Sequence, residues 1–383
     1  MKVEQIKDAL KAEARRLGFQ LVGVTTPDPP PHFNIFEGWL AAGHHAEMGW
    51  LAAERSRQRR ADPRQILPEC ESILVLGMAY LPSPAGEGTG GEGKIASYAW
   101  GADYHEVLPP RLQALVNFIE EKVGAPVPNR WYTDTGPLLE RDLAQRAGLG
   151  WIGKNTCLIN PQAGSYFLLA EIVLGLALPP DEPFTPDHCG SCTRCLAACP
   201  TGCILPNRTL DANRCLSYLT IEHKGAIPPD LRPQIGNWIF GCDLCQQVCP
   251  WNQRFSVPSA EASFAPTPGV ARPTLASELI LTPQAFNRKF KGSPVKRAKR
   301  RGYLRNVAIA LGNQADPAAI PALRAALSDP EPLVRGQAAW ALGQIRGREA
   351  LLALQAAAQT ETDSTVQSEI QAALQNHTPL ENH

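Results

Sequence analysis

The sequence has no long apolar run. A membrane-spanning helix needs about eighteen or more consecutive apolar residues, and the most apolar stretch, residues 166–178, is shorter and contains Glu171. The first residues, Met1-Lys-Val-Glu-Gln, alternate as a helix does and lack the apolar core of a signal peptide. We therefore expect neither membrane insertion nor export, and we expect a cytoplasmic protein.

An excess of charge of either sign is also absent. The 37 Lys and Arg residues are balanced by 37 Asp and Glu residues, so any surface that attracts a polyanion must be local. Hydrophobic residues make up 44% and charged residues 19% of the 383 residues. This composition is typical of a globular chain, and the length is sufficient for two or three domains with sizeable cores.

Cysteine is scarce outside one segment. Nine of the eleven cysteines lie between residues 189 and 249, which favours metal ligation in a reducing compartment over scattered disulfides. The run from Cys189 to Pro200 has the C-x2-C-x2-C-x3-C-P spacing with which two-cluster bacterial ferredoxins hold 4Fe-4S clusters. This segment therefore predicts an iron-sulfur domain.

A second cysteine run, from Cys242 to Pro250, is one ligand short. It fills the later three places of the same pattern, while Ile239 occupies the first place. Two four-iron clusters need about eight thiolates, so the missing ligand must be Cys203 or Cys215. We choose Cys215, because Cys203 follows the preceding cysteine too closely to wrap around a cluster, and we interpret Cys203 as a packed thiol.

The ferredoxin crossover rule then predicts two ligand sets. One cluster takes Cys189, Cys192, Cys195 and Cys249, and the other takes Cys199, Cys215, Cys242 and Cys245. A pair of zinc sites is the alternative, since zinc also uses C-x2-C pairs. The triple spacing and the proline after each run favour iron and sulfur.

Apolar periodicity predicts alternating helices and strands over the first 180 residues. Helices are predicted at 3–17, 38–60 and 111–122, and strands at 19–24 and 72–80. Residues 131–148 indicate a strand end that runs into a helix with Pro137 in its first turn. The glycine-rich residues 86–91 match G-x-G-x-x-G but have no strand before them and no helix after them, so we interpret them as a surface loop. Together these patterns indicate an α/β or α+β domain.

Two further features follow the cysteine segment. Nine of the eighteen residues from Arg288 to Arg305 are Lys or Arg and none is acidic; this density is typical of contact with a phosphate backbone, and a solvated helix face is the alternative. Leu311-Gly312 is answered by Leu342-Gly343 and more weakly by Leu374, with a period of 31 and then 32 residues. This period predicts short HEAT-like pairs of helices.

From end to end, the chain resembles the epoxyqueuosine reductase family. The matching segments keep their order and are Arg60-Ala-Asp-Pro63, Tyr98-Ala-Trp-Gly-Ala-Asp103-Tyr-His105, Asp134-Thr-Gly136, Glu140-Arg141, Gly153-Lys154-Asn155, Gly164-Ser-Tyr166, the eight cysteines and the terminal repeats. Family members often have Arg where this chain has Ser97.

The resemblance implies a multidomain α+β fold. Residues 1–180 would form an α/β cobalamin-binding catalytic domain, related to nitroreductase-like and cobalamin-processing folds. Residues 181–265 would form a ferredoxin-like domain with two 4Fe-4S clusters, and residues 266–302 a linker with the basic stretch. Residues 303–383 would form the HEAT-like repeat domain.

The resemblance also implies an activity. The chain would reduce epoxyqueuosine to queuosine at the wobble position of tRNA, the last step of queuosine biosynthesis, as a monomeric oxidoreductase. Cobalamin and the two clusters would be its cofactors, and an external low-potential donor of the ferredoxin or flavodoxin type would supply electrons. Opening an epoxide reductively takes electrons that no side chain stores, so the protein would position and protonate the substrate.

Particular residues match the positions that carry these roles in the family. Asp134 matches the proton donor, against the alternative that it caps the helix near Pro137. The implied cobalamin contacts are Arg60, Arg141, Lys154, Leu158, Leu169, Ser217 and Asp243. A tRNA with a GUN-type anticodon would lie along Lys296, Lys299, Arg301 and their neighbours Arg297, Arg300 and Arg305.

Two other classes of protein remain open. A cobalamin-dependent reductive dehalogenase would share the cofactors, but such proteins usually carry export signals and need neither repeats nor a basic stretch. An iron-sulfur electron-transfer protein would leave residues 1–180 without a role. The D-x-H-x-x-G signature of cobalamin domains with a lower histidine ligand is absent, since Asp103-Tyr-His105-Glu-Val-Leu108 lacks the glycine.

Overall fold

The computed structural model describes residues 2–81, 91–256 and 258–376. These fall into two compact units, which interleave along the chain. The first unit comprises residues 1–83, 101–213 and 243–265, and the second comprises 84–100, 214–242 and 266–383. Most of the glycine-rich loop lies outside the described residues.

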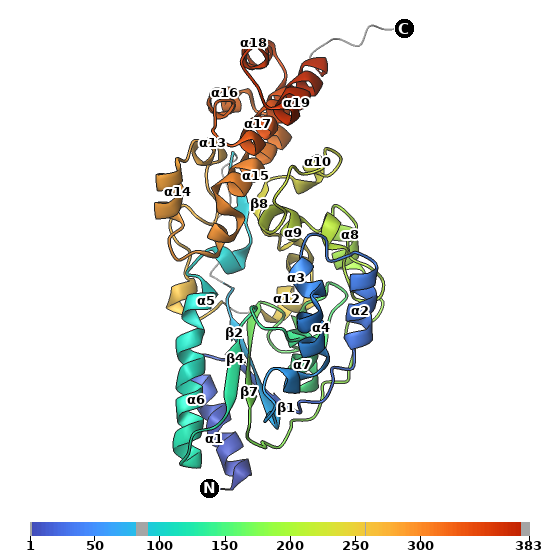
Figure 1. Ribbon diagram of the computed structural model, residues 1–383, viewed down its shortest axis with the longest axis vertical. Coiled ribbons are helices and arrows are strands. Elements are labelled where there is room, and N and C mark those ends of the chain that lie inside the picture. The colour runs from blue at the N-terminus through green and yellow to red at the C-terminus, as the bar shows by residue number, and fades with distance from the viewer. Residues whose placement is uncertain (1, 82–90, 257, 377–383) are drawn as a thin grey trace. The chain divides into compact units, whose positions relative to one another are not determined.

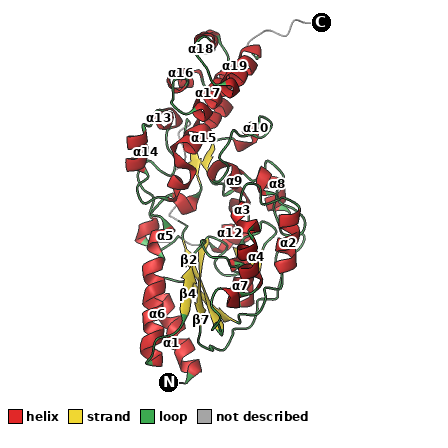
Figure 2. Ribbon diagram, in the orientation of Figure 1, coloured by secondary structure: helices red, strands yellow, loops and turns green. Residues whose placement is uncertain are grey.

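A four-stranded antiparallel sheet forms the centre of the first unit (Figures 1 and 2). Its strands are β1 (Leu21–Thr25), β2 (Ser72–Ala79), β7 (Phe167–Leu174) and β4 (Asn129–Tyr132), in that spatial order. Every residue of β1 and β2 is buried, because both faces of the sheet are covered by helices. The predicted strands at 19–24 and 72–80 are confirmed.

Helices cover the two faces of this sheet. In Figure 1, α1 (Val3–Arg16) and α6 (Pro109–Val123) lie to the left of the strands, and α7 (Glu140–Arg146) lies to their right. Leu143, Ala144 and Ala147 on or beside α7 pack with Val75 and Val173 in one apolar cluster. The helices predicted at 3–17 and 111–122 are confirmed, and α6 ends at Gly124 in the left-handed conformation.

Shorter elements complete the first unit. A small hairpin joins β5 (Trp151–Ile152) to β6 (Leu158–Ile159). The remaining helices are α2 (Phe33–Ala41), α3 (Gly49–Ala52), α4 (Glu54–Ala61), α5 (Tyr104–Val107), α8 (Arg194–Ala198), α11 (Leu244–Gln247) and α12 (Pro250–Phe255).

The single helix predicted at 38–60 is wrong. Three helices stand there, and the chain between the first two turns through Gly43 and Ala46, which have φ of +70° and +51°. A residue in the left-handed conformation ends a right-handed helix. The helical spacing of apolar residues continues past Gly43 and Ala46, but the helix itself does not. The helix expected at Pro137 likewise begins only at Glu140.

The second unit is mostly helical. Two short parallel strands, β3 (Lys94–Ile95) and β8 (Trp238–Phe240), pair beside α9 (Leu216–Ile221) and α10 (Arg232–Ile235). The other helices are α13 (Leu275–Leu279), α14 (Pro283–Lys289), α15 (Lys299–Gln314), α16 (Ile320–Ala326), α17 (Pro332–Ile345), α18 (Arg348–Ala358) and α19 (Ser364–Gln375). Residues 266–302, expected as a linker, thus contain α13 and α14.

The HEAT-like repeats are confirmed, and the repeated glycines explain their close packing. A side chain at Gly312 would come within 2.6 Å of Trp340 on the next repeat, and one at Gly343 within 2.8 Å of Ala373. Glycine is therefore required where α15 meets α17 and where α17 meets α19, because only it lets the backbones approach so closely. This is the physical basis of the Leu-Gly period.

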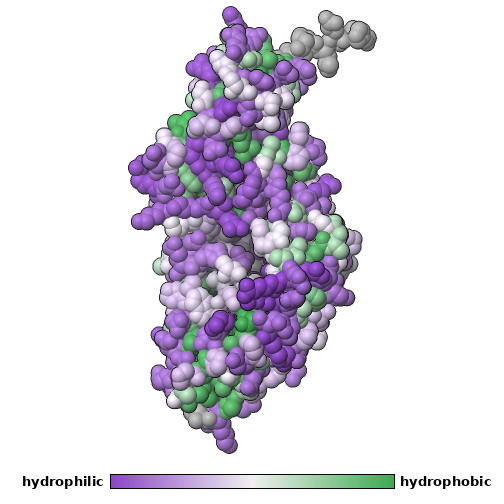
Figure 3. Space-filling model, in the orientation of Figure 1, coloured by the Kyte–Doolittle hydropathy of each residue, from purple (hydrophilic) through white to green (hydrophobic). Residues whose placement is uncertain are grey.

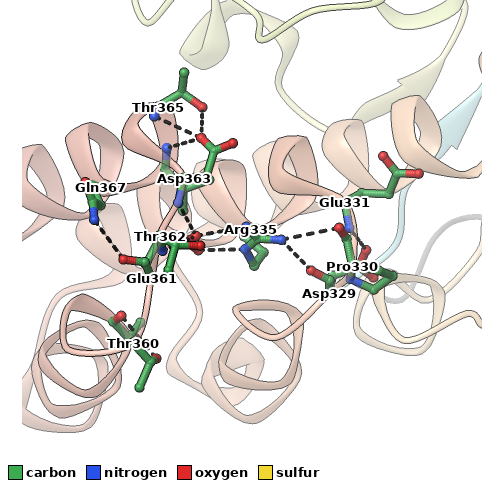
Figure 4. A network of polar contacts seen from close by, with 12 residues as sticks. Asp329, Pro330, Glu331, Arg335, Thr360, Glu361, Thr362, Asp363, Thr365 and Gln367 are labelled. Atoms are coloured by element: carbon green, nitrogen blue, oxygen red, sulfur yellow. Dashed lines mark hydrogen bonds and ion pairs between the residues drawn. The ribbon is translucent and has the colours of Figure 1, made fainter.

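Polar contacts join successive repeats at one end of these helices (Figure 4). Arg335 donates from Nε and Nη2 to the carboxylate of Glu361 at 2.6 and 2.9 Å, and from Nη1 to the carbonyl of Asp329 at 2.9 Å. The hydrogen bonds from Arg335 lower the pKa of Glu361 to about 2. Asp363 accepts from Thr365 N and caps α19.

No helix in the described part of the chain is long and apolar enough to cross a membrane. The face of the molecule shown in Figure 3 is mostly hydrophilic, with apolar residues scattered over it.

Candidate functional site

Asp134 stands in a strained turn after β4. Its φ of +58° lies in the left-handed region, which costs most residues other than glycine about 1 kcal/mol or more and which Asp and Asn tolerate better. Its side chain is 66% exposed, and its Oδ2 accepts a hydrogen bond of 2.6 Å from the hydroxyl of Tyr104. Helix α7 begins after Leu139 with no side-chain cap, so the alternative role of Asp134 as a helix cap is wrong.

Residues from α5 surround the exposed carboxylate of Asp134. His105 Nε2 lies 3.8 Å from its Oδ2, and His105 Nδ1 lies 2.8 Å from Oδ1 of Asp103. Burial alone would raise the pKa of Asp103, but hydrogen bonds from His105 lower it. Asp103 therefore holds the imidazole, and the imidazole and Tyr104 flank one side of Asp134.

Two further carboxyl groups lie behind this turn. Glu140 Oε1 accepts the backbone N–H of Asp134 at 2.9 Å. Glu171 belongs to β7, where Leu169 and Val173 on the same strand face pack toward α7. It is 0% exposed, and no donor within the described ranges reaches either of its oxygens. A buried carboxyl in that state is satisfied only when it carries the proton itself and donates to a neighbouring carboxylate.

Glu140 is that neighbour. Burial raises the pKa of Glu171 well above its usual range, followed by the charges of Glu140 and Asp134 and a shared hydrogen bond with Glu140. Burial likewise raises the pKa of Glu140 to about 7, together with the charge of Asp134, while Arg141 and Arg60 act in the opposite direction. The pair therefore shares a proton near neutral pH.

We expect this shared proton to make stability depend on pH. Glu140 has an ordinary pKa of 4.5 and a folded pKa of about 7. Between these values the folded chain binds more protons than the unfolded chain, so the free energy of unfolding falls as pH rises. Glu140 contributes at most ~1.4 kcal/mol per pH unit to this slope, and Glu171, whose pKa is also raised, adds to it. Replacing Glu171 with Gln should flatten this slope, because an amide N–H then stabilises ionised Glu140. Urea unfolding from about pH 5 to about pH 8 measures it.

The control for this prediction is Glu4→Gln, which removes an exposed carboxyl on α1. It should keep the wild-type slope. Equal slopes in wild type and Glu171→Gln would show that the pair does not hold an extra proton.

Two arginines that match cofactor-binding positions of the family, Arg60 and Arg141, also belong to the first unit. Arg60 is buried at the end of α4, where its guanidinium stacks over Phe36 at 5.7 Å and bonds Ser56. Burial lowers the pKa of Arg60, and the charge of Glu140 acts against this. Arg141 is exposed on α7. Arg60 and Arg141 therefore place two cations near the carboxyl pair.

The apolar residues matched to the cofactor are Leu158 in β6 and Leu169 in β7, which belong to the apolar cluster beneath α7. Asp243 is buried and its carbonyl accepts the N–H groups of residues 246 and 247. Ser217 lies on α9 in the second unit. Of the residues predicted for catalysis and cobalamin contact, only Ser217 thus lies in the second unit, and the first unit contains Asp134, Arg60, Arg141, Lys154, Leu158, Leu169 and Asp243.

Lys154 lies at the loop of the first cysteine run. Its Nζ donates to the carbonyls of Gly190 at 2.7 Å and Cys192 at 3.0 Å. Trp151 Nε1 donates to Cys189 Sγ at 3.4 Å. This lysine therefore fixes the backbone of a predicted ligand loop.

The four cysteines of one predicted ligand set all belong to the first unit, and their thiols influence one another's pKa. Burial raises the pKa of the Cys249 thiol, and the charges of Cys189 and Cys192 add to it. Burial also raises the pKa of Cys195, with Cys189 and Cys249 adding to it. Within the described ranges, no three His, Cys, Asp or Glu side chains are grouped so that they could hold a metal ion.

The second predicted ligand set is divided. Cys199 and Cys245 belong to the first unit and Cys215 and Cys242 to the second. Cys203 is buried with its Sγ 3.5 Å from that of Cys199. Nothing in this geometry decides between Cys203 and Cys215, and the choice of Cys215 stays a prediction.

The basic stretch contains one residue that cannot contact a phosphate. Arg305 is 0% exposed, and its guanidinium donates to the carbonyls of Leu219, His223 and Gly225 at 2.6–2.8 Å. Its prediction as a tRNA contact is therefore wrong. A helix buried on every side, as α15 is over most of its length, gives no periodic signal of which arginine points inward.

The other basic residues differ in how far they are already paired. Arg300 pairs with Asp329 and donates to the carbonyl of Leu281, and Arg297 makes two hydrogen bonds to Glu222. Lys296, Lys299 and Arg301 are exposed. These last three are best placed to meet a polyanion.

Substitutions should separate the buried arginine from the exposed ones. Arg305→Met should lower the free energy of unfolding by about 3 kcal/mol or more, because three buried carbonyls lose their donor at ~1–3 kcal/mol each. Arg301→Met should leave stability within about 0.5 kcal/mol and weaken RNA binding instead. Urea unfolding and a filter-binding titration with an anticodon stem-loop measure the two effects. Equal loss of stability in both variants would contradict this division.

Sequence reasoning missed Tyr104, Glu171 and Trp151. One signal was available: Glu171 is the single charged residue inside an apolar run. A lone carboxyl in a buried strand is a candidate functional residue, because burial shifts its pKa. The contacts of Tyr104 and Trp151 depend on elements distant in sequence.

Comparisons with known proteins agree with this arrangement. Residues 188–252 match the model of a 4Fe-4S double cluster binding domain, residues 60–135 match that of epoxyqueuosine reductase QueG, and residues 299–375 match that of HEAT repeats. The epoxyqueuosine reductase of Pseudomonas aeruginosa is 42% identical over 345 residues, which cover 88% of this chain and 94% of that protein. The one from Escherichia coli is 38% identical, with 89% and 90% covered.

Solved structures are similar over nearly the whole chain. One is a crystal structure of epoxyqueuosine reductase with an epoxyqueuosine-modified tRNA-Tyr stem loop, with a TM-score of 0.89, 33% identity, and 98% of this chain and 100% of that chain covered. Another is the enzyme from Bacillus subtilis with its aspartate catalytic loop swung out of the active site, with a TM-score of 0.90, the same identity and the same coverage.

Proposed function

This chain belongs to the epoxyqueuosine reductase family, and on that premise we propose that it reduces epoxyqueuosine to queuosine at the wobble position of a tRNA. The conversion consumes two electrons and two protons and releases the epoxide oxygen as water. The carbon skeleton that remains carries a double bond. The double 4Fe-4S domain at residues 188–252 supports an oxidoreductase that delivers these electrons singly.

The geometry around Asp134 supports its role as the acid that protonates the departing oxygen. Its side chain is 66% exposed and only Oδ2 is bonded, by Tyr104, so no described residue bonds Oδ1. Glu140 holds the backbone of the same turn. A carboxyl group whose Oδ2 is fixed by a hydrogen bond and whose Oδ1 is accessible is able to give a proton to a bound substrate.

The residues of the first unit fit a cobalamin. A corrin presents amides and a phosphate around an apolar face, and this unit contains both the cationic Arg60 and Arg141 and the apolar Leu158 and Leu169. Cobalamin supplies low-potential cobalt chemistry when bound. Arg60 and Arg141 would hold its polar groups, and Asp134 would give a proton to the substrate. Ser217, Lys154 and Asp243 stay as proposed contacts.

The other assignments follow the same premise. We assign residues 1–180 to the catalytic domain, 181–265 to the cluster domain and 303–383 to the repeats. Lys296, Lys299 and Arg301, with Arg297, would lie along tRNA phosphates, so that affinity falls with salt. The wobble base has to leave its stack to be reached. We expect a cytoplasmic monomer that takes electrons from an external low-potential carrier.

The test is turnover on a defined substrate. The protein is reconstituted anaerobically with iron, sulfide and cobalamin, and an epoxyqueuosine-containing anticodon stem-loop is added with a small viologen reductant. Queuosine in the digested RNA supports the proposal. A protein that holds both cofactors and binds the stem-loop, yet leaves the nucleoside unchanged, would overturn it.

A further inference from the structure

The loop of the first cysteine run reaches solvent. Residues 185–188 and 190–191 are exposed, and Cys189, Cys192 and Cys195 are half-buried, whereas Cys249 is 8% exposed. A redox group held by these thiols would therefore be covered by protein beside Cys249 and would lie close to solvent beside the loop. Electrons from outside enter most readily where the covering layer is thinnest.

Aromatic rings connect a predicted ligand to that surface. Trp151, whose Nε1 bonds Cys189 Sγ, meets the ring of Trp251 edge-on at 5.1 Å, and Trp251 stacks on Phe255 at 5.3 Å. Trp151 is 1% exposed, while Trp251 and Phe255 are half-buried. The rings thus run from a buried indole at the thiol to an amphipathic surface of the kind that protein partners bind.

The charges around these rings are mostly positive. We define the entry face as Asp187, Arg194, Arg208 and Arg254 together with Trp251 and Phe255. Asp187 is the only acidic residue from 183 to 194, and Arg208 bonds it at 2.5 Å. The three cations and one anion leave a formal charge of about +2 on a chain whose net charge is zero.

Contacts between these residues place them on one surface. Arg194 Nη1 lies 3.4 Å from the side-chain oxygen of Gln253 on α12. Arg254 stacks over Phe255 at 5.2 Å. Loop 187–194 and helix α12 therefore present their cations together.

We propose that the entry face is the docking site of a small acidic protein that carries single electrons. This rests on the proposed function, because it names the donor for the same reaction. Two reduced carriers bind in succession, and each gives one electron to the chain and leaves oxidised. The two electrons, with two protons, reduce the epoxide and release water. Complementary charge speeds the encounter, and the apolar rings bring the carrier close to Cys189.

Binding of the carrier tests the proposal without turnover. Arg194→Glu/Arg254→Glu reverses two exposed cations of the entry face, and Arg15→Glu/Arg130→Glu makes the same change of charge on α1 and β4. The reconstituted proteins are titrated with an oxidised acidic flavodoxin at low salt. The entry-face variant should bind about tenfold more weakly or worse, the control should match wild type, and wild-type binding should weaken with salt.

Two kinds of reductant then distinguish docking from chemistry. With a viologen the entry-face variant should turn over the stem-loop as wild type does, whereas with reduced flavodoxin its kcat/KM should fall about tenfold. Equal loss with both reductants, an equal effect in the control variant, or weaker stem-loop binding in place of weaker carrier binding would overturn docking. Failure of wild type with the viologen would instead overturn the proposed function, and the titration would still decide the docking.

Discussion

Replacing Asp134 with Asn should reduce turnover of the epoxyqueuosine stem-loop by about 10²–10⁴-fold, the usual contribution of a general acid. Asparagine keeps the size of the side chain and can still accept from Tyr104, whose hydroxyl lies 2.6 Å from Oδ2. It cannot give up a proton to the departing oxygen. Single-turnover rates with a viologen reductant, on protein with wild-type iron and cobalamin content, measure this loss.

Tyr104→Phe is the graded comparison. It removes the hydrogen bond to Asp134 and leaves the carboxyl, so its rate should fall by about tenfold or less, in line with a lost hydrogen bond of ~1–1.5 kcal/mol. Asp103→Asn, which disturbs the partner of His105, should also have a small effect. A rate for Asp134→Asn within about threefold of wild type would mean that water or another group supplies the proton.

The strained backbone gives this comparison a second readout. Asp134 has φ of +58° and Asn tolerates that region as well as Asp does, so Asp134→Asn should not lose stability. Asp134→Ala should be less stable by about 1 kcal/mol, because alanine is poorer in the left-handed region. The Asp134→Asn variant should therefore lose turnover rate but not stability, whereas the Asp134→Ala variant should lose both.

The sequence was informative where chemistry depends on local spacing. The C-x2-C-x2-C-x3-C-P spacing by itself determines which thiolates can reach one cluster, and the double-cluster match at residues 188–252 agrees with it. The Leu-Gly period predicted the repeats for a similar reason: Gly312 and Gly343 are needed wherever one helix pair meets the next. Both patterns depend on residues that are close in the sequence, so they can be recognised in a single sequence without the structure.

The surroundings of Asp134 are different, because they come from separate elements. Tyr104 lies on α5, Glu140 on α7 and Glu171 on β7, and only the packing of α7 on the sheet brings the two glutamates together. Arg305 shows the converse error. Its neighbours in sequence are basic, but the carbonyls of α9 and the following turn bind its guanidinium. Composition predicts charge, and tertiary contacts decide exposure.

The cysteine ligands give the second large effect. Cys249→Ala should lower iron content from about eight to about four per chain, because a 4Fe-4S cluster that loses a thiolate ligand is no longer held. Turnover driven by a carrier protein should fall by more than about a hundredfold if every electron passes this cluster. Iron and acid-labile sulfide analysis, with the visible absorbance of the clusters, measures the loss. Cys70→Ala is the control, since that thiol is buried against the carbonyl of Ser72 and burial raises its pKa to about 11.

The same measurement decides between Cys203 and Cys215. Cys203 lies 3.5 Å from Cys199, within reach of the same cluster, whereas Cys215 begins α9 in the second unit. Spacing favours Cys215, so Cys215→Ala should lose about four irons and Cys203→Ala should keep them. The reverse pattern would make Cys203 the eighth ligand and would place all ligands but Cys242 in the first unit. That outcome would also remove the reason to expect Ser217, two residues after Cys215, beside the cofactor.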